Sequence, residues 1–136
     1  MKKLVIVGCG RLGGIVVDAL QKGLLSEYEL VGVYSRTASK AEALAARVQG
    51  CQVCGSVDEL LSLHPHFVVE AASPAAMREL ALPALRQGTS VVTLSIGAFA
   101  DDAFYAEVMQ TAKESGAPVY VVSGATGGFD VLQTAT

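Results

Sequence analysis

A glycine-rich turn near the N-terminus constrains the fold of this chain more than any other feature. The turn reads Gly8-Cys9-Gly10-Arg11-Leu12-Gly13 and follows directly on the apolar run Lys3–Val7. A helical stripe of apolar residues begins inside the turn and continues to Leu20. A strand, a G-x-G-x-x-G turn and a helix in this order form the context in which the motif binds a dinucleotide.

Each glycine of the turn has a predicted role. Gly8 permits the tight turn, Gly10 lets the backbone approach a phosphate, and Gly13 lets the helix pack closely on the strand. The helix N-terminus adds free N–H groups and a partial positive charge, which favour an anion. We therefore predict that the turn holds the pyrophosphate of a nicotinamide cofactor; the alternative is a glycine turn with no ligand.

Apolar strands alternate with helical patterns along the whole chain. Most strands are continuous Val/Ile/Leu runs, which are typical of parallel strands buried on both faces. The predicted strands are Lys3–Val7, Glu29–Ser35, Cys51–Cys54, Phe67–Glu70, Ser90–Leu94 and Val119–Val122. The pattern predicts one α/β domain, a doubly wound parallel sheet of about six strands in the order 3-2-1-4-5-6, which is a Rossmann fold.

Capping residues mark where the helices between these strands begin and end. Capping boxes at Ser39-x-x-Glu42 and Ser56-x-x-Glu59 predict two helix starts, and Gly50 is the predicted end of the first of these helices. Ser73 followed by Pro74 predicts another start. The last helix is expected to run from Asp101 or Asp102 to Gly116.

Length, charge and hydropathy narrow the class of protein. A chain of 136 residues suits a single domain. Its share of charged residues, 17%, is low. This low share fits a sheet covered on both faces, or a surface that meets a partner such as another copy in a homo-oligomer. The formal net charge of −3 gives no indication of nucleic-acid binding. We find no apolar run of the ~18 residues that a membrane span requires, so we expect no membrane association. Because the N-terminal apolar run breaks at Gly8 and no cleavage site follows, we interpret it as a strand and not a signal peptide, and expect a cytoplasmic location.

The end of the second predicted strand bears on the choice between NAD and NADP. The stretch Ser35-Arg36-Thr37 contains none of the acidic residues that usually bind the ribose 2′-hydroxyl of NAD. The two hydroxyl groups and the guanidinium could instead bind a 2′-phosphate. We predict that NADP binds at least as well as NAD; the alternative is a solvent-exposed arginine without a ligand.

Small residues follow the remaining strands at the edge where cofactors bind in such sheets. The three stretches are Ala71-Ala72-Ser73, Ser95-Ile96-Gly97-Ala98 and Ser123-Gly124-Ala125. Because small side chains let a flat ring and a ribose approach the backbone, we expect these loops to line the nicotinamide side of the site.

Other candidate residues are assigned structural roles. His64 and His66 precede the fourth strand, at the edge opposite the cofactor. Cys51 and Cys54 are expected to point to opposite faces of a short strand, which does not favour a metal or redox pair. Glu70 is interpreted as a polar support of the site or a satisfied core acid. We identify no catalytic residue and no metal ligand in the chain.

Four stretches of the chain resemble the aspartate dehydrogenase family, which is related to the nucleotide domain of homoserine dehydrogenase. They are Gly8–Gly13, Val68–Ser73, Ser95–Asp101 and Ser123–Asp130. The resemblance implies a full-length enzyme that converts L-aspartate and NAD(P) to iminoaspartate and NAD(P)H and supplies NAD biosynthesis. It also implies that Ala125 contacts the cofactor.

In the same family, the catalytic histidine lies in a second α+β domain. The resemblance therefore implies that residues 1–122 form the dinucleotide-binding domain, and that residues 123–136 are a hinge loop and the start of a helix leading to a catalytic domain that would follow Thr136. Two other interpretations stay open. One is a stand-alone NADP-binding module or sensor, and the other is the cofactor domain of a different two-domain oxidoreductase.

Overall fold

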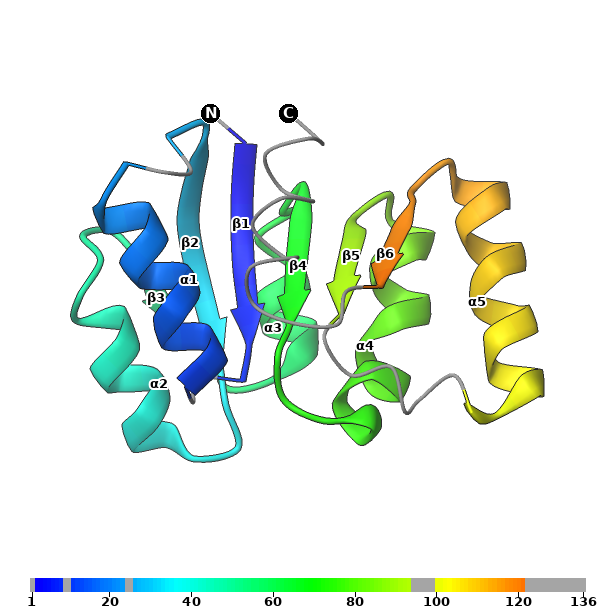
Figure 1. Cartoon of the computed structure of the whole chain (residues 1–136), viewed down its shortest axis with the longest axis horizontal. Coiled ribbons are helices and arrows are strands. Elements are labelled where there is room, and N and C mark those ends of the chain that lie inside the picture. The colour runs from blue at the N-terminus through cyan, green and yellow to red at the C-terminus, as the bar shows by residue number, and fades with distance from the viewer. Residues whose placement is uncertain (1, 9–10, 24–25, 94–99, 122–136) are drawn as a thin grey trace.

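The computed structural model describes residues 2–8, 11–23, 26–93 and 100–121, and these residues contain a six-stranded, wholly parallel sheet (Figure 1). The strands are β1 (Lys2–Val7), β2 (Tyr28–Tyr34), β3 (Gln52–Val53), β4 (Phe67–Glu70), β5 (Ser90–Thr93) and β6 (Val119–Val121). Their order is β3-β2-β1-β4-β5-β6, and every neighbouring pair runs parallel. The predicted fold and strand order are both confirmed.

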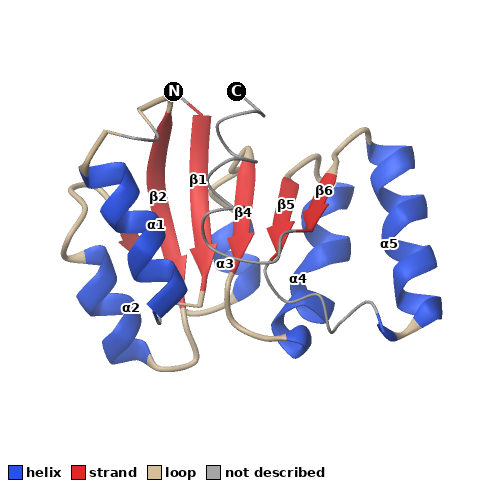
Figure 2. Ribbon diagram, viewed as in Figure 1, coloured by secondary structure: helices blue, strands red, loops and turns tan. Residues whose placement is uncertain are grey.

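Helices cover the sheet from two sides (Figure 2). They are α1 (Arg11–Gln21), α2 (Ala38–Ala45), α3 (Val57–Leu61), α4 (Pro74–Arg86) and α5 (Asp102–Ser115). In the view of Figure 2, α1 and α2 lie in front of the sheet, α3 and α4 lie behind it, and α5 lies beyond β6 and packs against α4. This is the doubly wound arrangement that the right-handed crossover rule predicts.

Alternate residues of β1 belong to two separate apolar cores, one on each face of the sheet. Leu4 and Ile6 pack with Val17 of α1, whereas Val5 packs with Leu80 of α4. All of these side chains are fully buried. The continuous apolar run of β1 is explained by burial on both faces.

A β-bulge interrupts the pairing of β1 with β2. Leu4 pairs with Leu30 but Val5 pairs with Gly32, so Val31 is the extra residue. A Cβ at Gly32 would lie 2.7 Å from Leu63 Cδ1, which shows how closely the residues after α3 approach the sheet. The missing side chain therefore lets this segment pack directly on β2, just before that strand reaches the carboxyl edge.

The predicted helix caps are confirmed for three helices. Ser56 Oγ accepts a hydrogen bond from Glu59 N, Ser73 Oγ accepts one from Ala76 N, and Asp101 Oδ1 accepts bonds from the first turn of α5. Gly116 ends α5 with φ 71°, in the left-handed conformation that favours glycine.

The prediction for α2 was wrong at both ends. The N-cap is Thr37, whose carbonyl accepts from Lys40 N and Ala41 N, so Ser39 lies inside the helix and does not cap it. The helix ends at Ala45, and a series of turns leads on to Gly50. The Ser-x-x-Glu spacing was misleading because a threonine two residues earlier already begins the helix.

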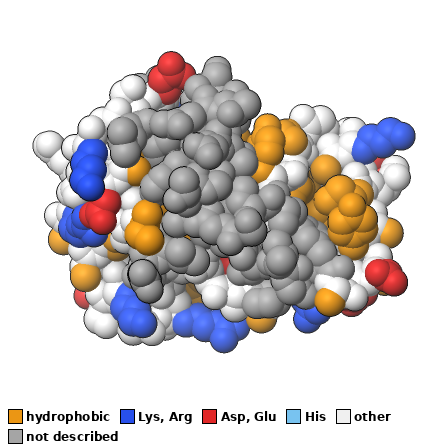
Figure 3. Space-filling view, viewed as in Figure 1, with side chains coloured by type: hydrophobic (Ala, Val, Ile, Leu, Met, Phe, Trp, Pro, Cys, Tyr) orange, Lys and Arg blue, Asp and Glu red, His pale blue; other side chains and the backbone are white. Residues whose placement is uncertain are grey.

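Acidic and basic side chains are spread around the rim of the face shown in Figure 3, with apolar side chains between them on the side of α5. Tyr105 of α5 is the large aromatic side chain that is most open to solvent among the described residues, at 48% exposure.

None of the helices in the described part of the chain has the length and apolar character needed to cross a bilayer.

Candidate functional site

The glycine turn is locked against two neighbouring segments at the carboxyl edge of the sheet. Gly8 has φ +95°, and its N–H donates to the Tyr34 carbonyl at 2.8 Å. A Cβ at Gly8 would lie 2.8 Å from both Cβ and N of Ala72, and a Cβ at Gly13 would lie 2.6 Å from the Gly8 carbonyl oxygen. Any side chain at either position would push apart the end of β1, the start of α1 and the loop after β4, so both glycines are required sterically.

The N-terminus of α1 is free of acidic residues in its first turn. Its first N–H groups have no partner within the helix, and the helix dipole places partial positive charge there. Both properties fit a bound anion such as a pyrophosphate. Cys9 and Gly10, together with the side chains of Arg11 and Leu12, lie outside the described part of the structure.

Glu70 organises the loop that faces the glycine turn. Its Oε2 accepts hydrogen bonds from Ala72 N at 2.7 Å and Ser73 N at 2.9 Å, and its Oε1 accepts one from Thr93 Oγ1 at 2.7 Å. The Glu70 side chain is fully buried. Because these bonds fix the backbone of the Ala71–Ser73 loop, the interpretation of Glu70 as a satisfied acid that supports the site is confirmed.

Thr93 is a site residue that the sequence analysis missed. It pairs with Glu70 across the β4–β5 register, and both side chains are completely buried. Two polar residues at the last positions of adjacent strands, each directly after a Val-Val pair, were the signal that could have revealed the pair. Their cross-strand contact depends on register, which a single sequence does not give directly.

A cavity of about 230 Å³ opens between the end of β1, the end of β2 and the start of α4. Five of the predicted cofactor residues line it together: Gly8, Ser35, Arg36, Ala72 and Ser73. Their neighbours along the walls are Val7, Tyr34, Val57, Ala76 and Glu79. Apolar wall residues together with two exposed charged residues, Arg36 and Glu79, suit a flat ring carried on a polar sugar phosphate.

Some predicted site residues do not line this cavity. Ala71 is half-buried and precedes the lining residues of the same loop, and Thr37 is exposed at the N-cap of α2. Ser95, Gly97 and Ala125 lie outside the described residues. Five described residues that line the cavity were not selected from the sequence: Val7, Tyr34, Val57, Ala76 and Glu79.

A second cavity, of about 350 Å³, lies on the other side of Arg36, between the start of α2 and the segment after β3. Arg36 is exposed and borders both cavities. Ser35 Oγ accepts a hydrogen bond from Thr37 N at 3.3 Å, whereas the Thr37 side chain makes no capping bond. The loop after β2 therefore presents a cation and an uncommitted hydroxyl near the N-terminus of α2.

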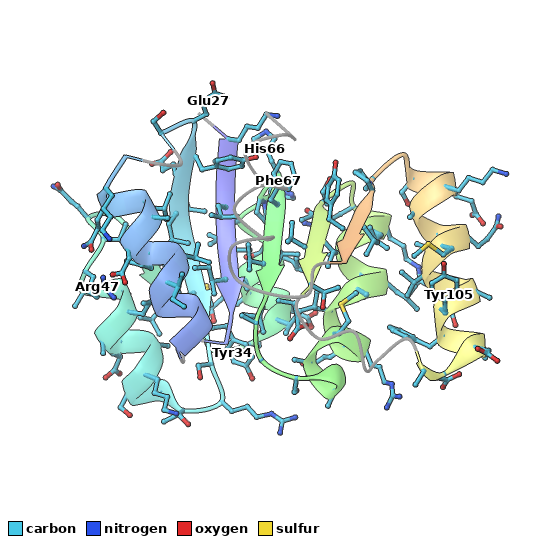
Figure 4. The ribbon with its side chains drawn as sticks, viewed as in Figure 1. Glu27, Tyr34, Arg47, His66, Phe67 and Tyr105 are labelled. Carbon is cyan, nitrogen blue, oxygen red and sulfur yellow. The ribbon has the colours of Figure 1, made fainter. Side chains whose placement is uncertain are left out.

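The two histidines lie away from this site, as predicted. Figure 4 shows His66 at the amino edge of the sheet and Tyr34 at the carboxyl edge. His66 Nδ1 accepts a hydrogen bond from Lys3 N at 2.9 Å, which gives it a structural role. His64 is exposed in the turn after α3, with φ 52°.

The two described cysteines point to opposite faces, as predicted. Cys51 packs against the core that contains α1, and Cys54 belongs to the core that contains α4. Both are free thiols. Burial raises the pKa of the Cys54 thiol, and the nearby charge of Glu59 raises it further, so this thiol stays protonated and unreactive at neutral pH.

Comparison with known proteins agrees with this geometry. The profile of the family described as "Homoserine dehydrogenase, NAD binding domain" matches residues 8–122. The chain is 35% identical to an L-aspartate dehydrogenase of Methanocaldococcus jannaschii over 98% of its length, and 36% identical to one of Methanosarcina acetivorans over its whole length. It spans 49% and 50% of those two proteins, about half their length.

A solved structure with a similar fold is a putative myo-inositol dehydrogenase from Sinorhizobium meliloti. It superposes with a TM-score of 0.75 at 19% identity, over 90% of this chain and 36% of that one. At this identity, the similarity supports the fold alone.

Proposed function

The chain belongs to the family of homoserine dehydrogenase NAD-binding domains, and on that premise we propose that it is the cofactor domain of an aspartate dehydrogenase-like oxidoreductase. The observation that carries the proposal is the cavity between Gly8, Arg36 and the Ala72–Ser73 loop, in a chain that matches L-aspartate dehydrogenases from end to end. The complete enzyme would oxidise L-aspartate to iminoaspartate. In this proposal, residues 1–122 are the cofactor domain and residues 123–136 lead toward the substrate domain.

The residues present fit a dinucleotide. Gly8 and Gly13 leave free the space that a Cβ would fill, and the acid-free first turn of α1 accepts a diphosphate. The bound cofactor supplies the ring that accepts hydride. The chain's own residues bind the diphosphate and hold the adenosine half in the cavity, which fixes the direction in which the rest of the cofactor extends along the carboxyl edge.

NADP is proposed to bind at least as well as NAD. Arg36 is exposed beside the cavity and lacks a hydrogen bond or ion pair within the described residues, so its guanidinium is available to a 2′-phosphate. The unengaged hydroxyl of Thr37 and the N-terminus of α2 lie next to it in sequence. A carboxylate at the end of β2, which would repel a 2′-phosphate, is absent from Ser35-Arg36-Thr37.

Titration of both cofactors against Arg36→Ala tests this preference. We expect the variant to lose about tenfold or more in NADP affinity, because a charge-assisted pair to phosphate is removed, and to change little toward NAD. Arg86→Ala serves as a matched control, since Arg86 is an exposed arginine at the far end of α4. Unchanged NADP affinity in Arg36→Ala would refute the assignment.

The substrate is tested on a longer gene product that carries this chain. Such a protein should reduce NADP or NAD with L-aspartate, whereas homoserine should be a poor substrate. Turnover of homoserine or a sugar in place of L-aspartate would instead indicate another two-domain oxidoreductase.

A further inference from the structure

One acidic side chain faces the cavity from α4. Ser73, Ala76 and Glu79 are spaced three residues apart, so they lie along one side of the helix, and all three line the cavity. Ser73 and Ala76 are joined by the capping hydrogen bond at the helix start. Glu79 is the next residue in this row and adds a carboxylate to the lining of the cavity.

The carboxylate of Glu79 is not used by the fold. Within the described residues, Glu79 makes no hydrogen bond or ion pair, and its side chain is exposed. The helix positions three and four residues away hold Ala75, Ala76, Leu82 and Pro83, and none of these side chains can donate a hydrogen bond. Glu79 therefore contrasts with Glu70, whose oxygens are occupied by loop and strand donors.

The rest of the cavity suits a planar, uncharged ring. Val7, Val57, Ala72 and Ala76 supply apolar wall, and the two charged lining residues, Arg36 and Glu79, are exposed to solvent. Its volume of about 230 Å³ is below the roughly 300–1,000 Å³ of sites that enclose a drug-sized ligand. The size of the cavity thus suits one ring system of a dinucleotide, with the exposed side chains of Arg36 and Glu79 among its lining residues.

A carboxylate discriminates between purines because it can only accept hydrogen bonds. At the purine 6-position, the amino group of adenine donates, whereas the oxo group of hypoxanthine or guanine only accepts and would be repelled. Because the 6-oxopurines also carry an N1–H that can donate, this discrimination requires that the carboxylate face the 6-position and not N1. We propose that Glu79 accepts a hydrogen bond from the adenine 6-amino group and makes this site select adenine dinucleotides over 6-oxopurine dinucleotides. This inference rests on the proposed function, since it assigns the cavity to the base of the nicotinamide cofactor.

The test compares NADP with nicotinamide hypoxanthine dinucleotide phosphate, in which a 6-oxo group and an N1–H replace the 6-amino group and the bare N1 of adenine, by isothermal titration of the full chain. We expect the wild-type chain to bind the adenine form about tenfold more tightly, the effect of one hydrogen bond to a charged acceptor. In Glu79→Ala, the two affinities should agree to within about twofold, because the discriminating acceptor is gone. In Glu79→Gln, the amide can donate to the 6-oxo group, so the hypoxanthine form should gain affinity.

Glu107→Gln is the matched control, since it removes the same charge from an exposed position on α5 and should keep the wild-type preference. Equal wild-type affinities for the two dinucleotides, or a preference retained in Glu79→Ala, would overturn the inference while leaving the proposed cofactor site intact. Failure of the wild-type chain to bind either dinucleotide would refute the proposed function itself.

Discussion

The two edges of the sheet use their polar and aromatic side chains in different ways. At the amino edge, several of these side chains contact or hydrogen-bond other residues of the fold. His66 Nδ1 accepts from Lys3 N, the Lys2 ammonium lies 5.7 Å from the centre of the Phe67 ring, and Tyr28 packs edge-on against Phe67 with ring centroids 5.5 Å apart. Figure 4 shows His66 and Phe67 together at this edge.

At the carboxyl edge, two charged side chains of the described residues have no partner in the fold. Arg36 and Glu79 line the cavity, and neither makes a hydrogen bond or ion pair within the described residues. Glu70 is the exception, since its carboxylate is buried and holds the loop after β4. Burial and hydrogen bonding therefore distinguish Glu70, which holds the loop in place, from Arg36 and Glu79, which are available to a ligand.

The largest effect is expected where the carboxyl edge depends on a buried group. Glu70→Ala leaves two loop N–H groups and the Thr93 hydroxyl without their acceptor and opens a cavity, so unfolding free energy should fall by about 4 kcal/mol. Glu70→Gln keeps the shape and an accepting oxygen, and its amide can donate to Thr93, so its loss should be about 1 kcal/mol. Urea denaturation of both variants measures the difference; equal losses would show that hydrogen bonding is not what Glu70 contributes.

The next effect concerns the glycine turn. Gly8→Ala combines a positive φ with a Cβ placed 2.8 Å from Ala72, so it should destabilise the chain by about 3 kcal/mol and weaken dinucleotide binding. Gly50→Ala is the matched control, because Gly50 also has positive φ, +81°, but has open space around its missing side chain. Gly50→Ala should cost about 1 kcal/mol and leave binding unchanged. If the two variants were equally destabilised, the contact with the loop after β4 would be unimportant.

The sequence predicted the sheet well because burial on both faces leaves a continuous apolar signal. β1, β4 and β5 were placed within a residue or two of their observed ends, and the strand order followed from the crossover rule. The start of α2 was misplaced because two hydroxyl residues, Thr37 and Ser39, compete as caps within one turn. Local spacing alone does not choose between them.

The cavity lining was predictable where it comes from the loops that follow the strands, but not where it comes from the strands' own last residues, Val7 and Tyr34, or from helix faces. Ser35, Arg36, Ala72 and Ser73 were found because parallel strands all end at the same edge. Glu79 was missed because its position depends on how α4 is rotated on the sheet. That rotation is set by packing of the buried residues of α4, which a single sequence does not place in space.

A smaller effect is expected at the amino edge, from the buried hydroxyl group of Tyr28. Burial of Tyr28, together with the negative charges of Glu27 and of the ionised Tyr120 hydroxyl, raises the pKa of the Tyr28 hydroxyl from 10.0 to about 12. The unfolded chain releases this proton near pH 10, while the folded chain keeps it, so the stabilisation is complete below pH 10 and is lost as the pH rises toward 12. The shift corresponds to about 3 kcal/mol.

Tyr28→Phe should therefore flatten the fall in unfolding free energy between about pH 10 and 12, measured by urea denaturation across that range. The ring contact with Phe67 remains in this variant. Tyr105→Phe is the control, because Tyr105 is half exposed on α5 and its change should leave the wild-type slope in place. A slope in Tyr28→Phe equal to that of the wild type would mean that Tyr28 does not titrate differently in the folded chain.

The smallest effects on stability are expected at the N-cap residues of two helices at the carboxyl edge, Ser73 and Thr37. The Ser73 hydroxyl accepts from Ala76 N, so Ser73→Ala should lower the unfolding free energy by about 1 kcal/mol. The Thr37 side chain makes no capping bond, so Thr37→Ala should cost a few tenths of that, roughly 0.3 kcal/mol. If the Thr37 hydroxyl instead binds the 2′-phosphate, Thr37→Ala should weaken NADP binding about tenfold more than NAD binding, since one hydrogen bond to a charged acceptor is lost. The opposite outcome is that Thr37→Ala destabilises the chain as much as Ser73→Ala does and leaves the binding of both cofactors unchanged. That result would assign Thr37 a role in the stability of the fold and none in the cofactor site.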